Sequence, residues 1–201
     1  MSDAPIQTQA TAELRSKLRY LVPLGLFGLL LVVLVVGLVR APEKDVLPSQ
    51  LIGRSAPQFS LPSLMAGHRP VSSEQLKGHW TVVNVWGSWC YVCRIEHPTL
   101  LMIHQQTQIP IIGIDWNDDE NDARGWLGQL GDPYSEIGVD HDGRFAIDWG
   151  VYGAPESFLV NPSGQIVYRQ WGAMTPQVWQ REFTSRIGPA ARISPPAPTG
   201  S

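Results

Sequence analysis

Cysteine is almost missing from this chain, whose 201 residues include only Cys90 and Cys93. A structural zinc site needs four ligands, but the sequence has no second Cys pair and no His-x3–5-His pair. Haem attachment through Cys-x-x-Cys-His fails because the next residue is Arg94. A purely structural disulfide between neighbours this close would contribute only about 2 kcal/mol. These absences favour a redox role for the pair.

Charge is also sparse, since Asp, Glu, Lys and Arg make up 16% of the residues and the net charge is −3. The chain has no basic tract, which argues against a nucleic-acid-binding protein. Internal repeats at a solenoid period are absent too. A chain of this length fits one domain with additional segments.

One long stretch, residues 20–39, carries no charge and reads YLVPLGLFGLLLVVLVVGLV. As a helix it would be about 30 Å long, the thickness of a bilayer core. A cleaved signal peptide is the alternative, but its apolar region usually spans only about 7–15 residues. The possible cleavage triplet 39–41 is followed by Pro42, which makes a poor site. We therefore predict a single N-terminal transmembrane anchor at 20–39.

The flanks of this stretch suggest its orientation. Three basic residues precede it, whereas the two that follow it are interspersed with acids (Arg15, Lys17 and Arg19; Arg40 and Lys44). The positive-inside bias favours a cytoplasmic segment at 1–19 and an exported C-terminal domain. A polar linker at 40–49 leads to the folded domain, predicted at 50–188. The Pro-rich residues 189–201 cannot build a core, so we predict a disordered tail.

The domain alternates strand-like and helix-like stretches, which indicates an α/β fold with a small mixed sheet flanked by helices. The predicted elements are strands at 81–88 and 109–116, helices at 92–106, 117–131 and 175–188, and a hairpin at 157–171. Pro98 is expected to kink the first helix. Thr175 and Pro176 are expected to begin the last helix as N-cap and first residue.

The two cysteines follow a predicted buried strand and open a helix. Near the N-terminus of that helix, unpaired N–H groups would favour the Cys90 thiolate, which can attack a substrate disulfide. Cys93, one turn further on, would be more buried and would resolve the mixed disulfide.

Two longer motifs carry a family resemblance: NVWGSWCYVCRIEHP at 84–98 and GVYGAPESFLVNPSG at 150–164. The region from Gln50 to Ile187 resembles the CcmG or DsbE family, membrane-anchored thioredoxin-like proteins of cytochrome c maturation. The resemblance implies a thioredoxin fold in the bacterial periplasm, on an inner-membrane anchor. It implies reduction of the haem-binding cysteines of apocytochrome c, directly or through a partner thiol protein. A transmembrane thiol carrier of the CcdA or DsbD kind would supply the electrons, with no bound cofactor and no metal.

The resemblance also implies roles for residues around the groove. Pro155 matches the family's cis-proline, and the backbone of Ala154 would pair with an extended substrate segment. Trp89 would form part of the substrate-facing surface, and Tyr152 and Asp115 would line the groove by analogy. The dipeptide between the cysteines, Tyr-Val, departs from the family, where proline comes first.

Generic thioredoxins carry a buried Asp six residues before the first cysteine, where this chain has Asn84. We hypothesise that Glu96 and Glu156 replace it as general bases for Cys93, the latter approaching from the sheet. The alternative is that both are ordinary solvated carboxylates. Nearby carboxylates disfavour a thiolate and would make the pair reducing. His97 is expected to be solvated.

Two other functions use the same features. A general thiol oxidant or isomerase on this fold would have a high reduction potential and a strongly acidic Cys90. A redox-silent docking module for apocytochrome would still support maturation with both cysteines changed to Ser.

Overall fold

The computed structural model describes residues 22–36 and 51–191, which belong to two separate units. Residues 22–36 form a helix with exposed apolar side chains. Within the two described ranges, no helix is both long and apolar enough to cross a membrane. The predicted anchor at 20–39 extends past the described helix at both ends, so it stays a prediction. The predicted segments 1–19 and 40–49 lie outside the described residues.

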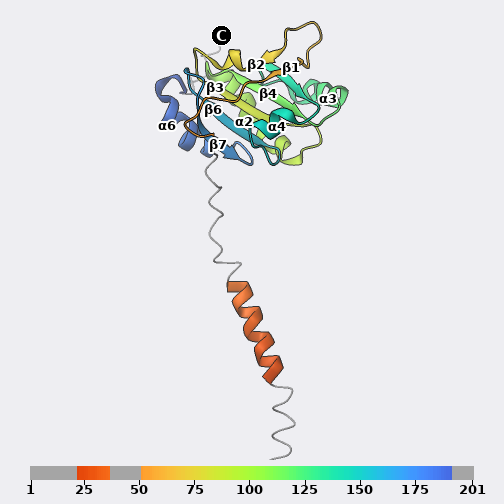
Figure 1. Ribbon diagram of the computed structural model, residues 1–201, viewed down its shortest axis with the longest axis vertical. Helices are drawn as coiled ribbons and strands as arrows, with labels where there is room; N and C mark the ends of the chain where they lie inside the picture. The colour runs from red at the N-terminus through yellow and green to blue at the C-terminus, as the bar shows by residue number, and fades with distance from the viewer. Residues whose placement is uncertain (1–21, 37–50, 192–201) are drawn as a thin grey trace, which may run out of the picture. The chain divides into compact units, whose positions relative to one another are not determined.

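A five-stranded mixed sheet forms the centre of the domain, with strand order β5-β4-β3-β6-β7 (Figure 1). Its strands are β3 Thr81–Trp86, β4 Ile111–Trp116, β5 Glu136–Asp140, β6 Glu156–Val160 and β7 Ile166–Trp171. The first three run parallel, and β6 is antiparallel to both β3 and β7. All six residues of β3 are buried, as expected for a central strand with helices over both faces.

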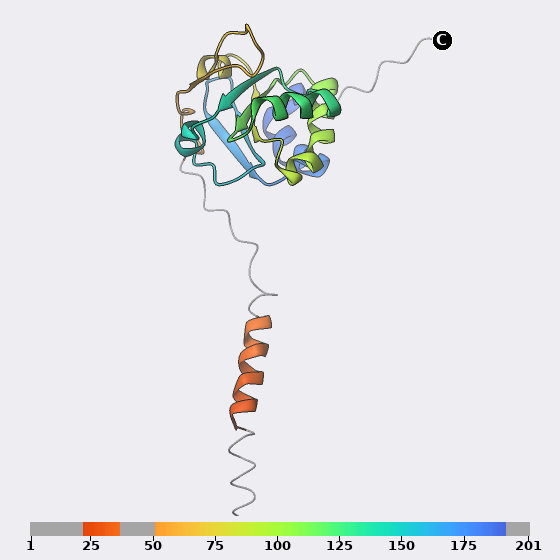
Figure 2. The same ribbon diagram turned by 90° about the vertical axis from the view of Figure 1, so that its right-hand side faces the viewer.

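Helices cover the two faces unequally. The helices are α2 Tyr91–Gln106, α3 Glu120–Leu130, α4 Arg144–Asp148, α5 Pro176–Val178 and α6 Thr184–Ile187, with a π-helical turn η2 Trp179–Phe183 between the last two. One apolar cluster joins α2, α3 and the C-terminal helices to the sheet, and a second joins α4 to the opposite face. Figure 2 shows the small teal helix α4 on the side of the sheet opposite α2.

Several predicted elements are confirmed with shifted ends. The helix predicted at 92–106 is α2, which runs on through Pro98. The 157–171 hairpin is the β6–β7 pair. Thr175 caps the C-terminal helices by accepting a hydrogen bond from the Val178 N–H, and Pro176 is the first helical residue.

The region between the second predicted helix and the hairpin is not a simple connection. It contains β5 and α4, neither of which was predicted. A short pair, β1 Ser60–Leu61 and β2 Val71–Ser72, followed by the 3-10 turn η1 Ser73–Leu76, was missed as well. These elements are short, and β5 is held by parallel pairing with β4, a contact that local sequence does not reveal. The described chain also continues helically through η3, Gly188–Ala191, past the predicted boundary at 188.

Candidate redox site

The two cysteines are joined in a disulfide at the start of α2, with their Cα atoms 5.2 Å apart. Cys90 is the N-cap residue, and its Sγ accepts a hydrogen bond of 3.1 Å from the Cys93 N–H. The exposed fraction is 5% for Cys90 and 1% for Cys93. The first cysteine is therefore the more accessible one, and its sulfur accepts one N–H of the helix N-terminus, a contact that favours a thiolate.

The loop between β3 and α2 is held from the side of β4. Asp118 accepts hydrogen bonds from both the backbone N–H and the hydroxyl of Ser88, the latter at 2.8 Å. The Trp89 indole N–H donates to the Trp116 carbonyl at 3.3 Å, and the two rings meet edge to face. Trp89 nevertheless remains 52% exposed. It lies beside Cys90 with half of its surface open to a substrate.

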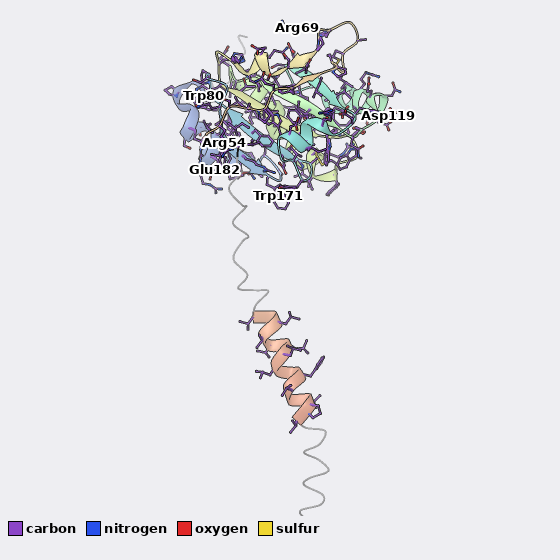
Figure 3. The ribbon with its side chains drawn as sticks, viewed as in Figure 1. Arg54, Arg69, Trp80, Asp119, Trp171 and Glu182 are labelled. Atoms are coloured by element: carbon purple, nitrogen blue, oxygen red, sulfur yellow. A yellow bond between two sulfur atoms is a disulfide. The ribbon has the colours of Figure 1, made fainter. Side chains whose placement is uncertain are left out.

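The Ala154–Pro155 peptide is cis, as the sequence predicted. Because β6 is antiparallel to β3, Pro155, which precedes β6, lies next to the C-terminal end of β3, where the chain turns toward Cys90. The Pro155 carbonyl accepts a hydrogen bond of 3.0 Å from Gly172 N–H, and Ala154 packs on the apolar cluster that contains both cysteines. Trp171, labelled in Figure 3, points outward from the end of β7.

Glu96 is a buried carboxyl on the helix face that carries Cys93. It lies three residues after Cys93 on α2, and both side chains are buried, so they share the face of the helix that packs on the sheet. Its two oxygens accept hydrogen bonds from the Asn84 side-chain amide at 2.9 Å and the Met174 N–H at 2.7 Å. Burial raises the pKa of Glu96 from 4.5 to about 7, against the opposing effect of these hydrogen bonds.

Glu156 does not approach the cysteines, contrary to the expectation. It pairs with Val85 across the β3–β6 ladder, and Val85 belongs to the apolar cluster on the α4 face. Directly opposed residues in an antiparallel pair project to the same face, so Glu156 points away from α2. There it forms a buried ion pair with Arg169, with 2.7 Å between Nη2 and Oε2, and accepts a hydrogen bond from the Tyr152 N–H.

This ion pair instead holds the segment that precedes the cis-proline. Arg169 Nη2 also donates a hydrogen bond to the Gly150 carbonyl at 2.8 Å, and Glu156 accepts one from the Tyr152 N–H at 3.2 Å. Both backbone contacts fall within the residues just before Pro155. Burial raises the pKa of Glu156, and the Tyr152 amide and the Arg169 charge act in the opposite direction.

Two other exposure expectations need correction. His97 is 2% exposed rather than solvated: its Nε2 lies 3.0 Å from the Gly131 carbonyl and its ring packs on Trp126. Burial lowers the pKa of His97. Asp115 is fully buried, so of the two groove residues named by analogy only Tyr152, 85% exposed, can touch a substrate. Burial, followed by the charge of Asp118, raises the pKa of Asp115 to about 8.

Asn84, which stands where generic thioredoxins have a buried Asp, connects three buried side chains through hydrogen bonds. Its amide donates to Glu96 and also to the Ser157 hydroxyl at 3.0 Å, while its carbonyl oxygen accepts a hydrogen bond from the Tyr134 hydroxyl at 2.8 Å. The sequence signalled only the position of Asn84, from its spacing to Cys90. Tyr134, Ser157 and Arg169 carry no such local signal, because only the folded sheet brings the first two to Asn84 and the third to Glu156.

A mixed sheet with a Cys-x-x-Cys disulfide at the first turn of α2 and a cis-proline before β6 defines a thioredoxin-fold thiol–disulfide oxidoreductase. The comparisons agree. The Redoxin family model matches residues 51–184. A secreted Mycobacterium tuberculosis disulfide oxidoreductase, described as homologous to E. coli DsbE, shares the fold. Its TM-score is 0.53 at 21% identity, covering 65% of this chain and 94% of that one.

Two relatives are much closer in sequence, and both are named thiol:disulfide interchange protein DsbE. The one from Allochromatium vinosum is 41% identical, covering 82% of this chain and 90% of the relative. The one from Pseudomonas aeruginosa is also 41% identical, covering 81% and 89%. The chain belongs to the DsbE family of thiol:disulfide interchange proteins.

Proposed function

We propose that this protein is a periplasmic thiol:disulfide reductase that reduces the haem-binding cysteines of apocytochrome c, directly or through a partner thiol protein. The observation that carries the proposal is the disulfide at the first turn of α2 together with a buried, protonatable carboxyl, Glu96, on the same helix face. The family name of the relatives supports thiol–disulfide exchange. The proposal adds two things to this: the exchange runs in the reducing direction, and its substrate is apocytochrome c or a partner thiol protein.

The reaction transfers two electrons to the substrate. The Cys90 thiolate attacks one sulfur of the substrate disulfide, which forms a mixed disulfide and releases a substrate thiolate. Cys93 gives its proton to the Glu96 carboxylate and attacks Cys90 Sγ, which releases the second substrate thiolate. The two substrate thiolates then take up two protons, one from Glu96 and one from water, so the products are a substrate dithiol and the Cys90–Cys93 disulfide, the oxidised state in which the cysteines lie here.

The reducing direction follows from the charge beside the resolving cysteine. An ionised Glu96 would disfavour a Cys93 thiolate, which destabilises the reduced pair relative to the disulfide. Strong oxidants of this fold stabilise the thiolate instead. Glu96 alone supplies this charge, because Glu156 lies on the other face and is paired with Arg169.

We place the domain outside the cytoplasm, held to the bacterial inner membrane by the charge-free stretch at 20–39 with the N-terminus inside. Because the periplasm is oxidising, the disulfide must be re-reduced from the membrane. A transmembrane thiol carrier of the CcdA or DsbD kind fits that need. The exposed aromatic side chains Trp89, Tyr152 and Trp171 would contact the protein substrate.

The reduction potential of the full-length protein tests the proposal. It is equilibrated against dithiothreitol or glutathione and followed by tryptophan fluorescence, since Trp89 adjoins the disulfide. A value of about −200 mV or lower, toward the roughly −270 mV of thioredoxin, is expected of a reductase. A value near about −120 mV would make it an oxidant. A Cys90→Ser, Cys93→Ser protein that still supports cytochrome maturation would make it a docking module.

A further inference from the structure

A fully buried hydrogen-bond chain leads from the end of the β4–β5 connection to the proton carrier. The Tyr134 hydroxyl donates to Asn84 Oδ1 at 2.8 Å, and Asn84 Nδ2 donates to Glu96 Oε1 at 2.9 Å. A second bond from Nδ2 reaches the Ser157 hydroxyl at 3.0 Å. The four residues come from four different segments of the domain and meet on the α2 face of the sheet.

The orientation of the Asn84 side chain decides what Glu96 meets. An amide presents two donors at its nitrogen and an acceptor at its oxygen, and the two ends have nearly the same shape. Glu96 and Ser157 can each adapt to either end, because a carboxyl can be protonated and a hydroxyl can rotate. The Tyr134 hydroxyl could also accept through its oxygen, but among the hydrogen bonds of the described residues the acceptor for its proton is Asn84 Oδ1 alone. Turning the amide over would leave that buried O–H without this acceptor, which is unfavourable.

The surrounding packing holds Tyr134 in place for this contact. Its ring stacks on Trp86, with centroids 5.3 Å apart and 20° between the planes. Gly113 lies directly opposite Asn84 on β4, and a Cβ there would stand 2.9 Å from the Tyr134 ring and from Trp86 Nε1. The glycine thus leaves the space through which the tyrosine reaches the amide. Any larger residue at that position would have to displace one of the two rings.

We propose that Tyr134 is a positioning residue of the redox site: it holds the Asn84 amide in the orientation that donates a hydrogen bond to Glu96. The inference rests on the proposed role of Glu96 as proton acceptor for Cys93. A donated N–H stabilises the ionised carboxylate, whereas the amide oxygen would stabilise the protonated acid. Tyr134 thereby keeps Glu96 able to ionise despite its burial, so that it can take the Cys93 proton.

Three factors set the pKa of Glu96: burial raises it, and the hydrogen bonds from the Met174 N–H and the Asn84 amide lower it. Tyr134 in turn lies in the field of Glu96, Asp132 and Asp115, and burial followed by these charges raises its pKa well above the usual value. The tyrosine therefore stays protonated and able to donate throughout the range in which Glu96 titrates.

Carbon-13 NMR of the Glu96 carboxyl in the full-length oxidised protein tests this directly. Tyr134→Phe keeps the ring on Trp86 and removes only the hydroxyl. The pKa of Glu96 is expected to rise by about one, a tenfold gain in proton affinity. The matched control is Tyr168→Phe, which removes a hydroxyl bonded to Gln170 at 2.9 Å outside this chain of contacts and should leave Glu96 unchanged. An unchanged Glu96 titration in Tyr134→Phe would overturn the inference.

A second variant keeps the test decisive if Tyr134→Phe does not fold. Ser157→Ala removes the other partner of the Asn84 amide but leaves the bond to Tyr134. Because the amide stays held, less than about a twofold change in the proton affinity of Glu96 is expected, well below the tenfold change that one pKa unit represents. A tenfold change would mean that Ser157, and not Tyr134, orients the amide.

The proposed function and this inference can fail separately. If Tyr134→Phe shifts the titration of Glu96 while Glu96→Gln leaves the Cys93 thiol titration unchanged, the positioning role stands and the proton-carrier role fails. If Glu96→Gln changes the Cys93 titration but Tyr134→Phe does not affect Glu96, the function stands and the positioning role is wrong.

Discussion

Glu96 and Glu156 are buried carboxylates on opposite faces of one sheet, and they differ in their hydrogen-bond and ion-pair partners. Glu96 accepts hydrogen bonds from a neutral amide and a backbone N–H, and burial raises its pKa to about 7. Glu156 is bound to the guanidinium of Arg169, whose side chain is 6% exposed. Glu96 can therefore change its charge near neutral pH, whereas Glu156 lies beside the permanent positive charge of Arg169.

The comparison shows that burial alone does not make a carboxyl a proton carrier. With neutral donors a buried carboxyl can gain or lose its proton, whereas a buried cation favours the ionised carboxylate and pairs with it as a structural contact. Here the contact joins β6 and β7 to the backbone at Gly150 and Tyr152, just before the cis-proline. The site as we propose it therefore divides between the faces, with proton transfer on the α2 side and support of the proline segment on the α4 side.

The largest expected effect comes from breaking this structural contact. Arg169→Met leaves Glu156 as a buried carboxylate without its partner, which should lower the free energy of unfolding by about 3–5 kcal/mol. Chemical denaturation of the oxidised protein at pH 7 measures it. The loss should be smaller at low pH, where Glu156 can be protonated.

The double variant Glu156→Gln, Arg169→Met is the control for that prediction. It removes both charges and keeps an oxygen for the Tyr152 N–H, so it should recover at least half of the loss, since neutral replacements of buried ion pairs are often tolerated. A double variant as unstable as Arg169→Met would mean that Arg169 acts through its hydrogen bond to the Gly150 carbonyl and its packing on Tyr152 and Phe158.

The sequence predicted those parts of the site that depend on local chemistry. The cysteine pair at a helix start and the Thr175 cap each follow from a few adjacent residues, the cis-proline follows from the family resemblance, and all three are found in the structure. The face of Glu156 was harder, because a strand's side chains alternate and the residue stands at the first position of β6. If the predicted strand is shifted by one residue, the Glu156 side chain is placed on the opposite face of the sheet.

Long-range contacts explain the rest of what the sequence did not predict. Tyr134 precedes β5 in a stretch with no helical or strand pattern, and it meets Asn84 only because Gly113 on the neighbouring strand has no side chain. The burial of His97 depends likewise on Trp126 of α3 and on the Gly131 carbonyl. Such contacts join residues far apart in the chain, and one sequence gives no sign of them.

A smaller effect should distinguish Glu96 by its pH dependence. Its pKa is 4.5 ordinarily and about 7 when folded, so between these values the folded state holds the extra proton. The stability contributed by Glu96 is therefore fully present below pH 4.5 and is lost as the pH rises to 7, by about 3 kcal/mol. Denaturation of wild-type and Glu96→Gln proteins from about pH 4 to pH 8 measures the difference in slope. Equal slopes would contradict the raised pKa.

The smallest expected effect tests the division between the faces at the thiol itself. In the reduced protein, Glu96→Gln removes a charge on the face that carries Cys93, so the midpoint of the Cys93 thiol titration should fall by about one pH unit. The double variant Glu156→Gln, Arg169→Met should move that midpoint by less than about 0.3, because its two charges cancel and lie beyond the sheet. Carbon-13 NMR of the Cys93 Cβ follows both. A shift in the double variant as large as that in Glu96→Gln would restore Glu156 to the proton path, since a carboxylate on the far face could then influence the thiol through β3.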